Sequence, residues 1–214
     1  MKRIIFTLMV CMGFFTFTMA QKDVKAKELL DKSSAALAQA GDIYAYFTLN
    51  LKDGNNKDSQ GFDGTIQMSG NKFKIDTPDR NIYFDGKTQW VYDKSYEEVN
   101  ISEPTGEEIQ ALNPKLIFFV YKNNSNLKYV GTKTDIKMRQ VQEVNIIPKK
   151  GDITQIVVQI SATDNFPVMF HIFYKNKIEN IIYINKYQIN QKFSDNLFVF
   201  DKKQFPNVEV IDLR

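Results

Sequence analysis

The chain has 214 residues, with 28 Lys and Arg, 25 Asp and Glu, one His and one Cys. Its formal charge of +3 comes from interspersed charges without a basic block. This disfavours a nucleic-acid partner, because such binding needs a concentrated cationic face. A single His excludes a multi-histidine metal site, and a single Cys excludes a disulfide framework.

The first 20 residues have the pattern of a secretory signal peptide. Lys2 and Arg3 precede an uncharged, largely apolar run over residues 4–18, and Thr18 and Ala20 place small residues at the positions that define cleavage. We predict cleavage after Ala20 and export. The alternative is an uncleaved membrane anchor, although the apolar run is at or below the roughly 17 to 25 residues that a spanning helix needs.

Cys11 raises a second alternative, the signal of a lipoprotein. The bulky Val10 before it disfavours this, because such signals have a small residue there, and the apolar run continues beyond the cysteine. Loss of residues 1–20 removes Cys11 and leaves 26 basic against 25 acidic side chains, a net charge of about +1. The remaining residues, 21–214, suit a single domain that is large enough to bury a core.

Residues 23–41 predict a helix, because small and apolar side chains recur at steps of three and four residues along one stripe. Asp23 can cap the start of this helix, and Gly41 can end it in a left-handed conformation. The stripe consists of Ala26, Leu29, Leu30, Ser33, Leu37 and Ala40.

From Asp42 the apolar period changes to two, which is typical of strands. Residues 43–51 alternate in this way, and the polar run 52–61 predicts a loop. Shorter alternating segments follow, separated by turn signals such as Asp85-Gly86, and predict an antiparallel sheet in meander order. These segments are 62–68, 73–75, 82–84 and 87–93.

The middle of the chain, residues 102–124, differs from the segments around it. Glu107 and Glu108 lie near a possible helix start, and Pro114 suits the first turn of a helix, so we predict one or two short helices over the sheet. A strand is the alternative for residues 116–121, which are aromatic or β-branched for the most part.

Six further segments carry strand signals and bring the total to about ten or eleven strands. Helices are predicted only at the start and in the middle, and no internal repeat or linker divides the chain. The predicted fold class is therefore α+β, with a large, curved antiparallel sheet and a few helices against one side. The six segments are 126–131, 141–148, 152–161, 166–174, 178–185 and 196–201.

Residues 168–174 are apolar on both faces, whereas a strand with one wet face alternates apolar with polar residues. A covering helix or a sandwich interior explains this pattern, and so does a concave face that lines an apolar cavity. The pattern alone does not separate these explanations.

The sequence lacks the usual motifs of catalysis. It has no G-x-S-x-G elbow, Walker A loop or dinucleotide-binding glycine pattern. His171 lies in mid-strand between two apolar residues, which is typical of a structural histidine. The adjacent pairs Glu97-Glu98 and Glu107-Glu108 do not face each other on a strand or on a helix. We therefore predict no enzyme activity, no cofactor and no metal.

Three stretches share their order with a known family. They are an Asp-Gly-Lys-Thr turn before a Trp-x-Tyr strand, a Pro-led apolar segment, and a Phe-x-Phe pattern that leads to a Val-x-Val end. Their residues are Asp85, Gly86, Lys87, Thr88, Trp90 and Tyr92, then Pro114, Leu116 and Ile117, then Phe198, Phe200, Val208 and Val210. In this order the sequence resembles the outer-membrane lipoprotein carrier (LolA-like) family over nearly all of residues 21–214.

The resemblance implies an incomplete β-barrel of about eleven strands with helices as a lid. The cavity between them takes the acyl chains of a lipoprotein and shields them from water in the periplasm, without a cofactor or a nucleotide. Family members take lipoproteins from an inner-membrane exporter and pass them to an outer-membrane acceptor. We expect the same kinds of partner here, and a monomer.

The alternating segments suggest which side chains hold the acyl chains. We expect the cavity lining to be Phe47, Leu49, Ile66, Met68, Phe73, Ile75, Trp90 and Tyr92. We expect the lid to contain Leu116, Ile117, Phe119 and Val120. The alternative for each of these residues is an ordinary core position, and the sequence does not fix which face of the sheet looks inward.

One segment departs from the family pattern. Relatives carry a Lys-Arg-Pro segment whose arginine is implicated in lid closure and release, whereas Ser69, Gly70 and Asn71 stand here before Phe73. This departure favours lipid holding over the full handover cycle of the family. The alternatives to a carrier are a LolA-like sensor or adaptor of the cell envelope and a structural envelope protein with a filled core.

Overall fold

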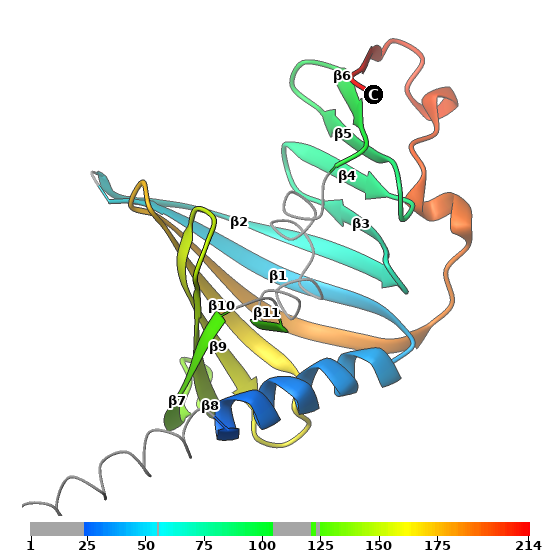
Figure 1. Cartoon of the computed structure of the whole chain (residues 1–214). Coiled ribbons are helices and arrows are strands. Elements are labelled where there is room, and N and C mark those ends of the chain that lie inside the picture. The colour runs from blue at the N-terminus through cyan, green and yellow to red at the C-terminus, as the bar shows by residue number, and fades with distance from the viewer. Residues whose placement is uncertain (1–23, 55, 105–120, 123–124) are drawn as a thin grey trace, which may run out of the picture.

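The computed structural model describes residues 24–54, 56–104, 121–122 and 125–214. This part of the chain forms one curved sheet of 12 strands and a helix over residues 24–39 (Figure 1). The helix lies across one end of the sheet, and the C-terminal segment runs beside the strands at the other end (Figure 1).

Short turns connect most of the strands. The strands are β1 (Asp42–Asp53), β2 (Asn56–Ser69), β3 (Lys72–Asp76), β4 (Arg80–Phe84), β5 (Gln89–Asp93), β6 (Glu98–Ser102), β7 (Ser125–Thr134), β8 (Gln140–Pro148), β9 (Ile153–Ser161), β10 (Pro167–Tyr174), β11 (Ile178–Gln191) and β12 (Glu209–Asp212). Two short 3-10 helices, η1 (Asp195–Phe198) and η2 (Lys202–Gln204), lie between the last two strands.

The sheet consists of two meanders that meet where β1 pairs with β11. Its strand order is β12-β6-β5-β4-β3-β2-β1-β11-β10-β9-β8-β7. All neighbours are antiparallel except β12, which pairs parallel to β6. The predicted meander order of β1 to β6 is confirmed, and so is the large antiparallel sheet.

The predicted turn at Asp85-Gly86 joins β4 to β5, and its geometry explains its residues. The Asp85 carboxylate accepts the backbone N–H groups of Lys87 at 2.9 Å and Thr88 at 2.8 Å. Gly86 has a φ of +104°, a conformation that a residue with a Cβ rarely adopts. Phe84 therefore comes to lie opposite Gln89, which fixes the register of the two strands.

The helix forms as the apolar stripe predicts. Ala26, Leu30, Ser33 and Leu37 are buried at steps of three or four residues, while the opposite side is exposed. Gly41, at a φ of +65°, turns the chain from the helix into β1. The predicted helix is thus confirmed over residues 24–39.

The two faces of the sheet carry separate apolar clusters. We call the face that packs against the helix the inner face, and the opposite one the outer face. The inner cluster joins the helix to side chains of β1 to β4 and β8 to β11. The outer cluster consists of Tyr83, Tyr92, Val99, Phe200 and Val208, with Trp90 and Phe205 packed against it. It joins β4 to β6 to the C-terminal segment.

Two sequence predictions are wrong in detail, and one strand was not predicted. The loop predicted over residues 52–61 is absent from most of that range, because the strands continue into this polar run and Leu51 pairs with Gln60. Residues 196–201 form part of η1 and an extended segment instead of a strand, because Phe198 and Phe200 pack as anchors against the sheet. Conversely, β12 adds a strand that is short and mostly exposed, so its sequence has no apolar alternation.

The predicted lid lies mostly outside the described residues. Within residues 102–124 the structure describes residues 102–104, where β6 ends, and Tyr121 and Lys122, which are helical. Leu116, Ile117, Phe119 and Val120 belong to the part of the chain that it does not describe, and their role as a lid stays a prediction.

The helix contributes to stability through its buried stripe, so truncation there should be costly. Leu30→Ala at a position with 0% exposure should lower the free energy of unfolding by about 2 to 5 kcal/mol. Val24→Ala on the same helix, at 67% exposure, should change it by less than about 0.5 kcal/mol. Urea denaturation measures both, and equal small effects would contradict the packing of the helix on the inner face.

Candidate functional site

The first half of the inner face consists of apolar side chains from β1, β2 and β3. Ala45 lies opposite Ile66, which lies opposite Ile75, and Ile43, Met68 and Phe73 form the next row. Because residues paired across antiparallel strands point to the same side, these rows form one apolar surface. All six side chains are buried in the inner cluster.

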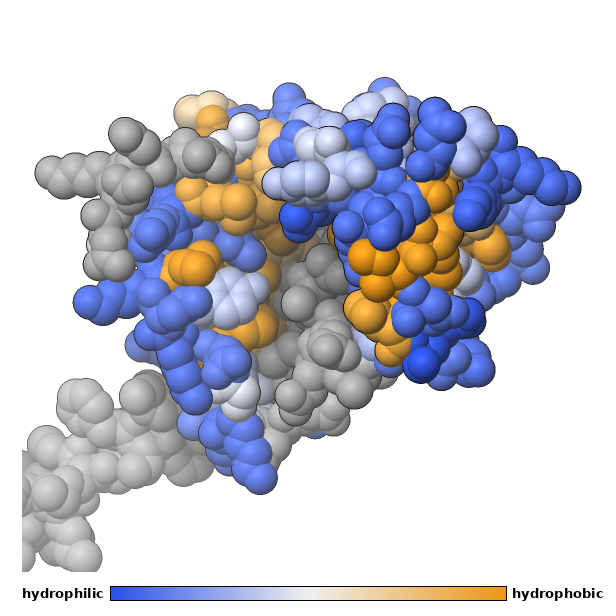
Figure 2. All heavy atoms as spheres, turned by 90° about the horizontal axis from the view of Figure 1, so that it is seen from above, coloured by the Kyte–Doolittle hydropathy of each residue, from blue (hydrophilic) through white to orange (hydrophobic). Residues whose placement is uncertain are grey.

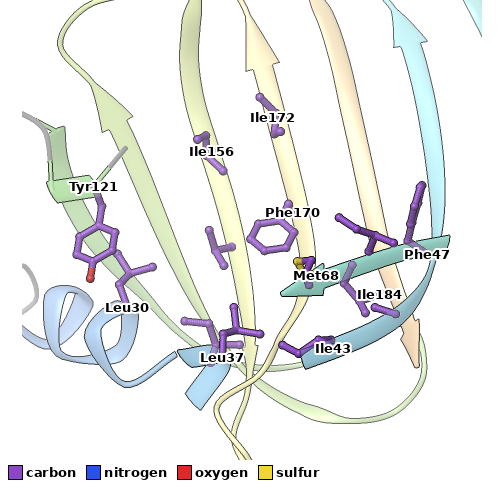
Figure 3. Close-up of a cluster of buried hydrophobic side chains, with 14 of the residues drawn as sticks. Leu30, Leu37, Ile43, Phe47, Met68, Tyr121, Ile156, Phe170, Ile172 and Ile184 are labelled. Carbon is purple, nitrogen blue, oxygen red and sulfur yellow. The ribbon is translucent and has the colours of Figure 1, made fainter. Parts of the chain in front are cut away.

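The second half comes from β8 to β11 and continues the first, with Asn180 of β11 as a polar side chain opposite Ile172. Val144, Val158, Phe170 and Ile182 form one row across the four strands. Ile146, Ile156 and Ile172 form the next row. Figure 3 shows Ile156, Phe170 and Ile172 on one side of the cluster and Phe47, Met68 and Ile184 on the other.

The helix is fastened to this surface by apolar packing and by one polar contact. Leu30 and Leu37 belong to the inner cluster, where Leu30 lies beside Tyr121 and Leu37 lies toward Ile43 (Figure 3). The Tyr121 hydroxyl donates a hydrogen bond of 2.6 Å to the Asp31 carboxylate, which also pairs with Lys27 at 2.6 Å. Burial, and then the bond to Asp31, raises the pKa of Tyr121, so its hydroxyl stays protonated.

A polar hollow of about 560 Å³ lies at the β4–β6 end of the sheet, lined by Arg80, Val91, Asp93, Tyr96, Glu98 and Asn100. Arg80 alternates with Ile82 and Phe84 of the inner cluster along β4, so the hollow opens on the inner face. Arg80 pairs with Asp93 at 3.0 Å, and Asn100 donates to Glu98 at 2.6 Å. The bond from Arg80 is the main reason that the pKa of Asp93 lies below its usual range.

Six of the eight predicted lining residues come together on the inner face. Phe47, Ile66, Met68, Phe73 and Ile75 belong to the inner cluster, and Leu49 packs against it. Viewed from above, hydrophobic side chains form two separate groups on the surface (Figure 2). Whether these side chains bind acyl chains stays a prediction.

Trp90 and Tyr92 do not join the other six, which corrects the expectation of one shared surface. Trp90 lies opposite Tyr83 on the outer face, and the Tyr92 ring contacts Phe205 with 4.6 Å between ring centroids. The reason is strand alternation. Since Phe84 is inner and lies opposite Gln89, the next residue, Trp90, must point outward. That register follows from the four-residue turn at 85–88. Counting residues across this turn in the sequence would therefore have placed Trp90 on the outer face.

Sequence analysis missed two parts of this site. The lining prediction omitted β8 to β11, whose side chains Ile156, Phe170 and Ile172 are as deeply buried as those of β1 to β3. The apolar alternation of these strands was visible but did not reveal which face is inner. The polar hollow was also missed, because its residues become neighbours only through the pairing of β4 with β5 and of β5 with β6.

Several titratable side chains of the described residues form isolated pairs. Within them, no group of three or more His, Cys, Asp or Glu side chains is arranged to hold a metal ion. His171 lies on the outer face, where its Nε2 is 2.8 Å from a Glu179 carboxylate oxygen and its ring stacks on Phe173. In the same part of the chain, no helix combines the length and the hydrophobicity that crossing a membrane requires.

Comparison with protein families now decides the relationship. Residues 16–171 match the family described as outer membrane lipoprotein carrier protein LolA. The chain belongs to the LolA family. The resemblance noted in the sequence is thereby confirmed, and the single open, curved sheet with its helix agrees with the LolA fold. No curated protein matches the chain.

Solved structures of low sequence identity are similar to this chain. An uncharacterized conserved protein from Thermus thermophilus is 11% identical, with a TM-score of 0.60 over 88% of this chain and 99% of that one. LprF from Mycobacterium bovis is 11% identical, with a TM-score of 0.49 over 79% and 96% of the two chains. A LolA superfamily protein from Nitrosomonas europaea is 9% identical, with a TM-score of 0.44 over 82% and 97%. At this identity, the Thermus protein shows the fold alone.

The Tyr121–Asp31 bond should stabilise the helix on the inner face. Tyr121→Phe should lower the free energy of unfolding by about 1 kcal/mol. Lys32→Gln should change it by less than about 0.5 kcal/mol, because the Lys32–Glu28 pair is exposed. Urea denaturation of the two variants beside the wild type measures both effects.

The contribution of this bond should depend on pH in a defined direction. Hydrogen bonds from Lys27 and then from Tyr121 lower the pKa of Asp31 below its ordinary 3.8. A carboxylate whose folded pKa is depressed stabilises the fold above the unfolded pKa and loses that effect as the pH falls through the folded pKa. The difference between wild type and Tyr121→Phe should therefore be full at neutral pH and shrink below about pH 4. A difference that grows on acidification would contradict this assignment.

Proposed function

We propose that the inner face binds the acyl chains of lipoproteins and that the protein carries them through the periplasm toward the outer membrane. The observation that supports this most strongly is the apolar inner face, which extends across β8 to β4 and ends at the polar hollow. A lipidated protein has the same two parts, hydrocarbon chains beside a polar group. Membership of the LolA family supports the same function.

Apolar contact is sufficient for capture. Burial of one methylene contributes about 0.8 kcal/mol, so a chain of about 15 methylenes gains on the order of 10 kcal/mol before the loss of its motion is counted. No specific polar contact has to supply this free energy. The hollow around Arg80 and Glu98 can then accept the polar part, which has to remain hydrated or hydrogen-bonded.

Acyl chains can enter only if the present contacts of the inner face are exchanged. Phe73, Phe170 and Leu30 are fully buried in this structure, so the incoming chain has to replace helix contacts or side-chain contacts. The free energy of those lost contacts offsets part of the gain from binding. A carrier needs this balance, because cargo that binds without such an offset is not released.

The helix is the element best placed to move. The helix is linked to β1 through Gly41. Its other contacts are the Tyr121–Asp31 hydrogen bond and the packing of its apolar stripe on the inner face. These contacts are few compared with the continuous pairing of the strands. We propose that the helix and the segment with Leu116, Ile117, Phe119 and Val120 open together when cargo enters.

The remaining parts of the proposal follow from the family. Residues 1–20 serve as a cleaved signal peptide, and residues 21–214 form a single binding domain in the periplasm. The protein acts as a monomer that takes lipoproteins from an inner-membrane exporter and delivers them to an outer-membrane acceptor. It binds and releases its cargo without covalent chemistry.

Tryptophan reporters on the two faces test the proposal. Native Trp90 reports from the outer face, whereas Leu49→Trp in a Trp90→Phe background reports from the edge of the inner cluster. Titration with a long-chain acyl amphiphile should shift the emission of the Leu49→Trp protein in a saturable way. Native Trp90 should change little, because the sheet separates it from the bound chain.

The matched pair of reporters also defines the result that would contradict the proposal. A saturable shift of Trp90 without a shift at position 49 would place the lipid on the outer face. No shift at either position, with circular dichroism showing both proteins folded, would argue for a filled core that takes no acyl chain.

A further inference from the structure

We propose that the turn between β7 and β8, residues 135–139, docks the protein on an anionic lipid surface. Its tip carries Ile136 and Met138, which are 72% and 83% exposed. Met138 has the largest exposed fraction of any large hydrophobic side chain in the described residues. Two such side chains at one tip are unusual on a protein surface unless they meet an apolar partner.

The turn holds these two side chains in a fixed position. The buried Asp135 carboxylate accepts the backbone N–H groups of Lys137 at 2.9 Å and Arg139 at 2.8 Å, and pairs with the Arg139 guanidinium at 2.7 Å. The Met138 N–H donates to the Asp135 carbonyl at 3.0 Å. Because the loop is already ordered, insertion into a lipid surface loses little backbone freedom.

The charges of this hairpin are arranged with the acids inside and the bases outside. Residues 128–143 contain four basic and two acidic side chains, a net charge of +2. Both acids are buried, and Asp135 pairs with Arg139 at 2.7 Å and Glu143 with Lys133 at 2.6 Å, which leaves the net charge of +2 on the exposed Lys128 and Lys137. Lys137 stands between the two apolar side chains and contacts the neutral Asn185, so an acidic side chain does not cancel its charge in the contacts seen. The exposed surface of the hairpin is therefore basic.

This combination fits a lipid surface better than a protein partner. A stable protein interface buries about 800 Å² on each side, and two side chains on a narrow turn cannot supply that area. A membrane interface accepts single apolar side chains at the depth of the headgroups, and anionic headgroups attract the surrounding lysines. The predicted contact is weak and reversible, as a protein that visits membranes requires. It does not depend on the acyl-binding proposal.

Vesicle sedimentation tests this inference. The purified protein should co-sediment with vesicles of phosphatidylethanolamine and phosphatidylglycerol, and bind phosphatidylcholine vesicles more weakly. Ile136→Ser with Met138→Ser should weaken this partition by about tenfold or more, since the apolar contact is lost. Lys137→Gln should weaken it by about fivefold at low salt.

Leu213→Ser is the matched control, because Leu213 is also exposed, at 64%, but lies near the C-terminus. It should bind like the wild type. All of these side chains are exposed, so circular dichroism and thermal unfolding should show unchanged folds. Vesicle binding that the double substitution leaves intact, binding that is indifferent to anionic lipid, or no binding to any vesicle would overturn the proposal.

Discussion

The packing of the helix and the two meanders on one inner face is the interaction on which the structure depends. Neither meander could bury its apolar rows alone, because each presents a single layer of strands. Pairing of β1 with β11 joins the rows, and the helix covers part of them. The same apolar surface that stabilises the fold is also the surface that could bind hydrocarbon, so stability and cargo binding compete for one set of side chains.

The C-terminal segment covers the apolar side chains on the outer face of β4 to β6. Tyr83, Tyr92 and Val99 would be exposed there without a cover. Phe200 and Phe205 stack on each other at 5.1 Å and on Tyr92, and β12 then pairs with β6. Trp90 and Tyr92 of the family pattern therefore contribute to a structural cluster on the outer face of this protein.

The sequence predicted most elements, because period and turn chemistry act locally. The helix stripe around Leu30 and the turn at Asp85-Gly86 needed only neighbouring residues. The site was harder to predict from the sequence, because long-range contacts decide which face of the sheet is the inner one. Phe47 and Ile66 lie on the inner face and Trp90 does not, although counting across the turn would have placed Trp90 correctly. The β12 strand was not predictable from alternation, because it pairs at an edge and stays mostly exposed.

The structure also explains the residues Ser69, Gly70 and Asn71, which stand where relatives have the Lys-Arg-Pro segment. Ser69 ends β2 and Lys72 begins β3, and Gly70 between them has a φ of +58°. Asn71 approaches Gly86 so closely that a Cβ on Gly86 would lie 2.8 Å from its side-chain nitrogen. The segment thus forms a tight hairpin turn against the β4–β5 turn. Under the proposed function, control of cargo release would fall to the contacts of the helix with the inner face.

Co-expression of the protein with a lipoprotein tests the central claim most directly. The acylated lipoprotein and its unacylated Cys→Ser form would each be expressed beside this protein, and soluble complexes would be isolated and weighed by native mass spectrometry. Our account predicts a one-to-one complex with the acylated form and none with the unacylated form. Equal capture of both forms, or of neither, would contradict the claim that the inner face shelters acyl chains.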